Sequence, residues 1–191
     1  MESEVTEINR VWSAVYAHPA WSVKQGHGSF LTIEFGQPEL QIREPMDARP
    51  EASPKVRESL ARRLVTVTGN WHLWIYCCKW VISANGTDIA RSESSDSVIA
   101  LATQKIDGQK ILSVTQGASP GSWVFSFDLG GEIRTHPYNE DPLVEQWYLF
   151  ERESGKVLAV RADDRFSYEH GNIAPDNKIW NPIDKNARCS R

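Results

Sequence analysis

Residues 69–82, GNWHLWIYCCKWVI, bring together the side chains of this chain that are best suited to bind a metal or a ligand. His72 and Cys78 are zinc-ligand types, but a straight strand places them about 20 Å apart, because it advances about 3.3 Å per residue. Zinc holds all of its ligands within about 2.3 Å. Cys77 and Cys78 point to opposite faces of a strand, which disfavours a disulfide between them. We therefore expect no metal site and no cofactor.

The same alternation predicts one aromatic face in this stretch. Trp74, Tyr76 and Trp80 have equal parity, so they share a face of the predicted strand. The opposite face is mostly aliphatic, and a run that is apolar on both faces is typical of a central strand. Two interpretations follow: the stretch is the spine of the core, or the three aromatic residues form the wall of a ligand pocket.

Two further candidates for ligand or partner contact lie in the second half of the chain. His136 stands at the end of a predicted strand, where loops often carry function. Trp147 lies in segment 139–153, which has five acidic residues and one basic residue. An aromatic, acidic segment suits a protein partner with a basic surface. The alternative is an ordinary exposed strand whose other face belongs to the core.

Acid–base chemistry has two candidate carboxylates, Glu34 and Asp128. Each stands one residue before the apolar residue that leads into a turn glycine. If pseudo-symmetry related their two hairpins, the carboxyl groups would converge on one site. Otherwise both are surface acids at strand ends. No motif for a nucleophilic serine, a phosphate loop or a metalloprotease occurs, which favours a non-catalytic protein.

The idea of pseudo-symmetry rests on an internal similarity between residues 29–42 and 123–135. With Pro38 as an extra residue in the first copy, both segments are apolar strands that end acidic–apolar–Gly. Each then makes a turn and opens a second strand with Glu. This predicts an internal pseudo-repeat of hairpins, although unrelated hairpins share the same alternation and turn glycines.

The elements around these residues predict an α+β fold that is mostly antiparallel β. A helix is expected over 4–17, with Ser3 as its N-cap and with Val5, Ile8, Trp12 and Val15 on one face at helical spacing. Ser53-Pro54 begins a second short helix. Alternating segments between turn residues predict about eight or nine short strands. We expect a sandwich or partly open barrel with two or three short helices. Its parts are an N-terminal helix (1–20), a single β-rich domain (21–170) and an irregular tail (171–191).

Composition narrows the environment of the chain. Its 191 residues are 40% hydrophobic and carry a net charge of −4, which argues against a nucleic-acid partner. No stretch approaches the ~20 apolar residues of a membrane span, and the N-terminus lacks the features of a signal peptide. The three cysteines, two of them adjacent, suit a reducing cytoplasm. We therefore expect a cytoplasmic protein without membrane or nucleic-acid partners.

Four segments carry a resemblance to known sequences: SFLTIEFG, RRLVTVTGNWHLWI, DGQKIL and FSFDLGG. Together they resemble a set of short bacterial proteins of uncharacterised function, over roughly residues 21–161. The resemblance implies a bacterial origin and a single recurring domain. It implies no activity, cofactor or catalytic residue.

Three functions are consistent with these patterns. The first is a non-catalytic protein-binding module, and an acidic, Trp-rich chain of this size has the general profile of bacterial toxin-neutralising immunity proteins. The second is a small-molecule binder with an aromatic pocket. The third is a hydrolase-like enzyme with paired carboxylates. An edge strand or exposed aromatic residues could also support a homodimer.

Overall fold

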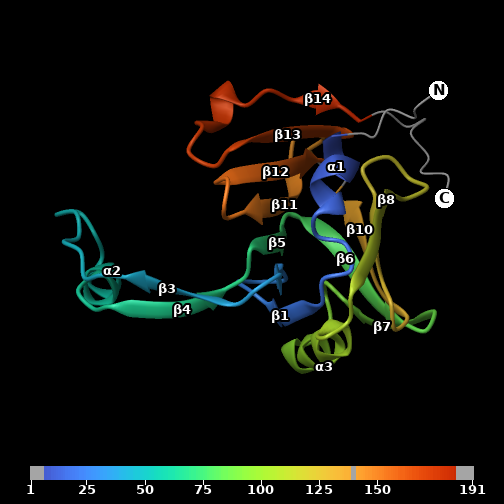
Figure 1. The fold of residues 1–191 in the computed structure, drawn as a ribbon, viewed down its shortest axis with the longest axis horizontal. Helices are drawn as coiled ribbons and strands as arrows, with labels where there is room; N and C mark the ends of the chain where they lie inside the picture. Colours follow the sequence, from blue (N-terminus) through green and yellow to red (C-terminus); the bar gives the residue numbers. More distant parts are fainter. Residues whose placement is uncertain (1–6, 139–140, 184–191) are drawn as a thin grey trace.

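The computed structural model describes residues 7–138 and 141–183. Within these ranges the chain forms two antiparallel sheets around a shared core, with a two-stranded arm that projects from one side (Figure 1). The predicted α+β fold with mostly antiparallel strands is confirmed, and the sheets are not closed. The described residues contain 14 strands, more than expected from the sequence.

Each strand of the two sheets runs antiparallel to its neighbours. In spatial order the seven-stranded sheet contains β1 (Ala20–Gln25), β2 (Leu31–Phe35), β5 (Trp71–Ile75), β11 (Glu145–Glu151), β12 (Lys156–Arg161), β13 (Arg165–His170) and β14 (Asn181–Pro182). The five-stranded sheet contains β7 (Thr87–Arg91), β6 (Cys78–Ala84), β10 (Gly131–Pro137), β9 (Trp123–Phe127) and β8 (Ile111–Gln116).

The core lies between the two sheets and includes helix α1 (Glu7–Ser13). The ring of Trp12 lies 6.1 Å from that of Trp147 in the larger sheet and 5.9 Å from that of Phe125 in the smaller one. Ile8, Trp12 and Val15 are buried, as their helical spacing predicts. Ser3 and Val5, which the same prediction includes, lie outside the described residues.

The single strand predicted over residues 71–83 is two strands in different sheets. The N–H of Cys78 donates to the carbonyl of Tyr76 at 2.8 Å, which closes a tight bend between β5 and β6. Leu73 and Ile75 face the core before the bend, whereas Cys78 and Trp80 face it afterwards, so the inward parity changes. The prediction that Trp74 and Trp80 share a face is therefore wrong.

The predicted hairpin over residues 29–42 is also wrong. Strand β2 pairs with β1 and β5, while β3 (Glu39–Arg43) pairs with β4 (Leu64–Thr68). Only the second segment, 123–135, forms a hairpin, through β9 and β10. The two segments look alike because both end a strand with a turn glycine, but Gly36 sends the chain away from the sheet. The predicted pseudo-repeat is not present.

The arm comprises residues 37–68 and consists of β3, β4 and a tip that contains helix α2 (Pro54–Leu60) (Figure 1). Ser53 caps α2 by accepting from the N–H of Val56 at 3.4 Å, so the predicted helix start is confirmed. Strands β2 and β5 are antiparallel neighbours, with Phe35 opposite Trp71. The arm is thus an insertion in the turn of a β2–β5 hairpin.

Two further elements complete the described fold. Helix α3 (Asp96–Ile106) packs against β1 and β7. After β13 the chain forms a 3-10 turn, η1 (Pro175–Asn177), and β14 then pairs with β13. The guanidinium of Arg161 lies 4.6 Å from the ring centroid of Trp180, which fastens this C-terminal segment to the sheet.

Candidate functional site

Two of the predicted contact residues, Trp80 and Trp147, belong to the core. Both are fully buried, and the indole N–H of Trp80 donates to the carbonyl of Ser29 at 2.5 Å. Trp147 packs its ring 5.1 Å from that of Trp123. Neither side chain is at the surface of the described structure, so neither can contact a partner there.

Trp74 and Tyr76 instead belong to a cluster of five rings, which we call the aromatic platform: Phe30, Trp74, Tyr76, Tyr148 and Phe150. It lies on the outer face of the seven-stranded sheet, because the alternate residues Leu73, Ile75 and Leu149 face the core. Neighbouring rings lie 4.5–5.9 Å apart, and all five are partly exposed.

The platform is bordered by charged side chains. The ammonium of Lys178 lies 5.7 Å from the ring centroid of Tyr148 and 2.9 Å from the carboxylate of Glu145. Burial and the hydrogen bond with Glu145 raise the pKa of Tyr148, so this phenol is protonated at neutral pH. The platform is therefore a neutral aromatic surface, which adds Phe30, Tyr148 and Phe150 to the two residues that the sequence indicated.

The two candidate carboxylates belong to different parts of the fold and have no partner in common among the described residues. Glu34, in β2, is buried and contacts His72 and Arg152, whereas Asp128 follows β9 and is exposed. Asp128 accepts from the backbone N–H of Lys110 at 2.8 Å, so its carboxylate links the end of β9 to the residue before β8. The structure does not unite the pair into an acid–base site.

Glu34 fastens the base of the arm. One carboxylate oxygen lies 2.7 Å from Nδ1 of His72 and 3.5 Å from the guanidinium of Arg152. The other accepts from the N–H of Gly69 at 2.9 Å. Burial opposes ionisation, but the hydrogen bonds from His72 and Gly69 and the nearby guanidinium of Arg152 hold the pKa of Glu34 below its ordinary value.

In this cluster the carboxylate of Glu34 orients the imidazole of His72, as in some catalytic sites, but there is no nucleophile beside the ring in the described residues. Among the described residues, no hydroxyl or thiol forms a hydrogen bond with His72. Its ring packs 5.7 Å from that of Phe150. The close fit at Gly69, where a Cβ would lie 2.2 Å from the carbonyl oxygen of Phe35, points to a structural role for the same region.

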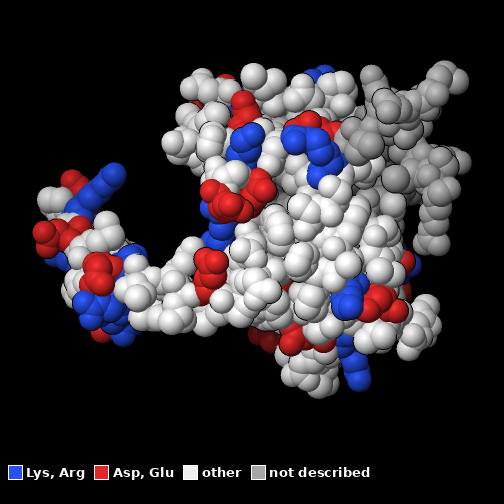
Figure 2. Space-filling model, viewed as in Figure 1, with Lys and Arg blue, Asp and Glu red and all other residues white. Residues whose placement is uncertain are grey.

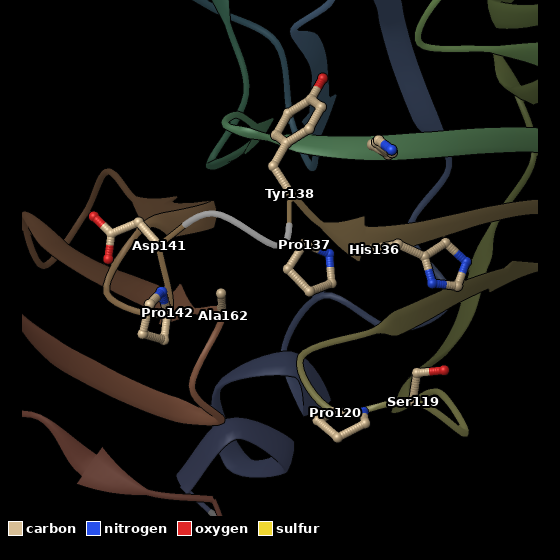
Figure 3. Close-up of a pocket in the computed structure, with 9 residues that line it drawn as sticks. Ser119, Pro120, His136, Pro137, Tyr138, Asp141, Pro142 and Ala162 are labelled. Atoms are coloured by element: carbon tan, nitrogen blue, oxygen red, sulfur yellow. The ribbon is translucent and has the colours of Figure 1, made fainter.

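His136 lines a pocket of about 540 Å³ at the end of β10 (Figure 3). Lys79 lies opposite His136 in the pairing of β6 with β10, and its ammonium is 5.8 Å from the ring centroid of Tyr138. The remaining lining residues come from the last position of β10 and from three loops: Pro137, Ser119, Pro120, Asp141, Pro142 and Ala162. In Figure 3 the polar groups of His136, Tyr138 and Asp141 point in different directions, so they do not converge on one reacting atom.

The cysteine region shows no feature of a metal site. In residues 7–138 and 141–183, no three His, Cys, Asp or Glu side chains gather closely enough to hold a metal ion. Cys77 and Cys78 are both free thiols. Burial raises the pKa of the Cys78 thiol, which leaves it protonated and unreactive.

The arm carries the largest concentration of exposed apolar side chains in the described structure. Half of the 14 exposed large hydrophobic residues lie within residues 37–68. Four of them share one face of the ribbon, because Leu40 pairs with Val67 and Ile42 pairs with Val65. We call these four residues the aliphatic face; their exposed fractions are 67%, 58%, 52% and 52% for Leu40, Ile42, Val65 and Val67.

Charged residues of the arm gather beyond this face, at the tip. Figure 2 shows a stretch without charged residues between the charged tip and the body of the molecule. At the tip Arg63 pairs with Glu44 at 2.7 Å, and Arg43 donates to the carbonyl of Ser59 at 2.8 Å. The sequence predicts strands in the segments of β3 and β4, but its pattern does not show that their apolar residues are exposed.

Comparisons of this chain with protein-family models, curated proteins and solved structures found no match. The bacterial family suggested by four sequence segments stays a prediction. Within the described part of the chain, no helix has the length and apolarity needed to cross a membrane.

Proposed function

We propose that this chain is a non-catalytic protein-binding module and that the arm is its binding element. The observation that carries the proposal is the aliphatic face, in which Leu40, Ile42, Val65 and Val67 are more than half exposed on a projecting ribbon. Contiguous exposed apolar surface of this kind marks interaction sites in proteins. A projecting ribbon can lie along a partner and present its face and its two free edges together.

Covering this face would supply part of the free energy of binding, and contacts elsewhere on the arm would have to supply the rest. Full burial of an exposed Val, Leu or Ile side chain contributes about 1.5–3 kcal/mol. Since about half of each side chain is available, the four together contribute roughly 3–6 kcal/mol before the costs of association. Contacts with the charged tip would add selectivity.

The charge distribution indicates what the partner surface must offer. The arm has five acidic and six basic residues, whereas the rest of the chain has 20 acidic and 15 basic residues. A partner that contacts only the arm needs an apolar strip with mixed charges beside it. A partner that also reaches the body would benefit from a basic surface, as the sequence predicts.

The other two functions have less support. An aromatic pocket between Trp74 and Trp80 is not formed, because Trp80 is in the core. The pocket beside His136 has divergent polar groups. Glu34 and Asp128 are the residues of the enzyme interpretation, and they are not brought together: Glu34 lies in β2 of the seven-stranded sheet, whereas Asp128 follows β9 of the five-stranded sheet.

The immunity-type interpretation supplies a concrete partner with which to test the proposal. It predicts that the neighbouring gene encodes a larger protein with a toxin domain, and that this protein co-purifies with the chain. The double variant Leu40→Ser/Ile42→Ser should weaken that capture at least tenfold, because it removes half of the aliphatic face.

A matched control is Leu129→Ser, since Leu129 is 69% exposed and lies on the body of the molecule. This variant should bind as the wild type does. Equal capture by all three proteins, or equal loss with Leu129→Ser, would contradict the role of the arm. Capture measured by surface plasmon resonance gives the affinity of each variant directly.

A further inference from the structure

In the part of the chain that the structure describes, no strand lies beside the outer edge of β3. Among the described strands, β3 pairs only with β4, so the two form an isolated two-stranded ribbon. A ribbon of two strands is marginally stable in water, and an open edge presents unpaired N–H and C=O groups that accept another strand. The arm therefore has a second binding element, its edge, in addition to the aliphatic face.

The residues of β3 are complementary to themselves in reverse order. The strand reads Glu39-Leu40-Gln41-Ile42-Arg43. In an antiparallel pair of two copies centred on Gln41, Glu39 of one lies opposite Arg43 of the other, and Leu40 lies opposite Ile42. Opposite charges at directly paired positions stabilise a sheet, whereas like charges destabilise it. Strand β4 has no charged residue, so its edge offers no such selection.

Neither Glu39 nor Arg43 forms an ion pair with a described residue. Glu39 is exposed and has no ion pair with any described residue. Arg43 also has no ion pair with any described residue: one terminal nitrogen of its guanidinium donates to the carbonyl of Ser59, and the other is buried. In the pair of copies, the positive charge of each Arg43 would lie beside the Glu39 carboxylate of the other copy.

We propose that β3 pairs antiparallel with β3 of a second copy of this chain, with Gln41 on the twofold axis. The two ribbons then form one four-stranded sheet in the order β4–β3–β3–β4, an isologous interface of the kind that closed dimers use. Because directly paired residues share a face, the two aliphatic faces become one continuous surface of eight side chains. The projection of the arm away from the body leaves room for the second copy (Figure 1).

This inference goes beyond the proposed function, since it concerns the edge of β3 and not the aliphatic face. Dimerisation would double the area of the aliphatic face. Protein partners of the module would then bind a dimer more tightly than a monomer.

Charge reversal tests the pairing by analytical ultracentrifugation. Wild-type protein should dimerise, and Glu39→Arg should raise the dissociation constant at least tenfold because two arginines then face each other on each side of the axis. Arg43→Glu should do the same with two glutamates. An equimolar mixture of the two variants should recover the dimer, because every pair is again of opposite charge.

Two controls separate pairing from damage to the arm. Glu153→Arg reverses an exposed charge on the body and should leave the dissociation constant unchanged. The double variant Glu39→Arg/Arg43→Glu restores opposite charges within a single chain and should dimerise even if Arg43→Glu alone loosens the tip.

A wild-type protein that stays monomeric at several hundred micromolar would overturn the inference. So would a mixture of the two reversed variants that fails to associate. Dimers that ignore the charge reversals but are lost in Leu40→Ser/Ile42→Ser would show face-to-face packing, which also contradicts edge pairing. In each of these cases capture of a different protein partner by the arm is measured separately, so the proposed function stands or fails on its own result.

Discussion

At the scale of single residues, Glu34 links the body of the molecule to the arm. Its carboxylate contacts side chains from β5 and from the residue after β11, and it accepts the N–H of Gly69, where the arm returns. Asn70 strengthens the same joint, because its side-chain oxygen accepts from the N–H of Gln37 at 2.6 Å. In the sequence Glu34 resembles a catalytic carboxylate. In the structure its buried carboxylate instead joins the strands at the base of the arm.

Glu34→Gln should lower the free energy of unfolding by about 1–3 kcal/mol at neutral pH, since it removes the charge from a buried hydrogen-bonded cluster. The pKa of Glu34 is lowered by folding, so its stabilisation is present above the ordinary carboxyl range and is lost as the pH falls through the folded-state pKa. The difference between wild type and variant should therefore shrink in acid.

Urea denaturation at a series of pH values measures this difference. Glu153→Gln is the control, because Glu153 is exposed. A wild type and a Glu34→Gln variant that differ equally at pH 7 and pH 3 would show that the charge of Glu34 does not stabilise the fold.

The types and spacing of the residues predicted which side chains are buried better than they predicted which side chains lie next to one another. Ile8, Trp12 and Val15 were found by helical spacing because a helix fixes its own face. Trp74 and Trp80 were placed on one face because alternation assumes a straight strand. The bend at Tyr76 and Cys77 depends on two different sheets receiving β5 and β6, which no local pattern reveals.

At the scale of elements, the arm is separable from the sheet that carries it. Strands β2 and β5 pair from Leu31–Ile75 to Phe35–Trp71 without any contribution from β3 or β4. The two ends of the arm meet where Gly36 has a φ of 82° and accepts no side chain without a clash against Asn70. At the base of the arm, β2 and β5 are therefore paired as the two strands of a short hairpin are.

Deletion of residues 37–68 should therefore leave a folded protein. The remaining Gly36, Gly69 and Asn70 form a three-residue loop, a common length for an antiparallel hairpin with glycine. The melting temperature should change by only a few degrees, because none of the deleted side chains belongs to the hydrophobic core. The deleted protein should lose both dimerisation and partner capture. An unfolded product by circular dichroism would show that the arm is part of the folding unit.

From the sequence, the positions of the strands were predicted more reliably than the pairing between strands. Segments that became β9 and β10 were recognised as a hairpin, since a Gly130-Gly131 turn joins two alternating strands. The same local signal after Phe35 failed, because pairing there is decided by β1 and β5, which lie elsewhere in the sequence. The exposed arm was missed for a similar reason: an apolar strand indicates burial unless the partner surface lies in another molecule.

At the scale of the whole molecule, the protein combines a well-packed body with a poorly covered arm. The body encloses aromatic residues from both sheets around Trp12, whereas most arm side chains are exposed. A packed body with an exposed apolar extension is the arrangement that the proposed association would complete. The structure brings together neither the candidate acid–base pair, Glu34 and Asp128, nor an aromatic pocket of Trp74 and Trp80.

Hydrogen–deuterium exchange of the full chain with and without its co-purifying partner tests the central claim most directly. The account predicts that partner binding slows exchange of the amides of β3 and β4, while the aromatic platform and the pocket beside His136 exchange as before. Slower exchange in the platform or the pocket, with β3 and β4 unchanged, would contradict the arm as the binding element.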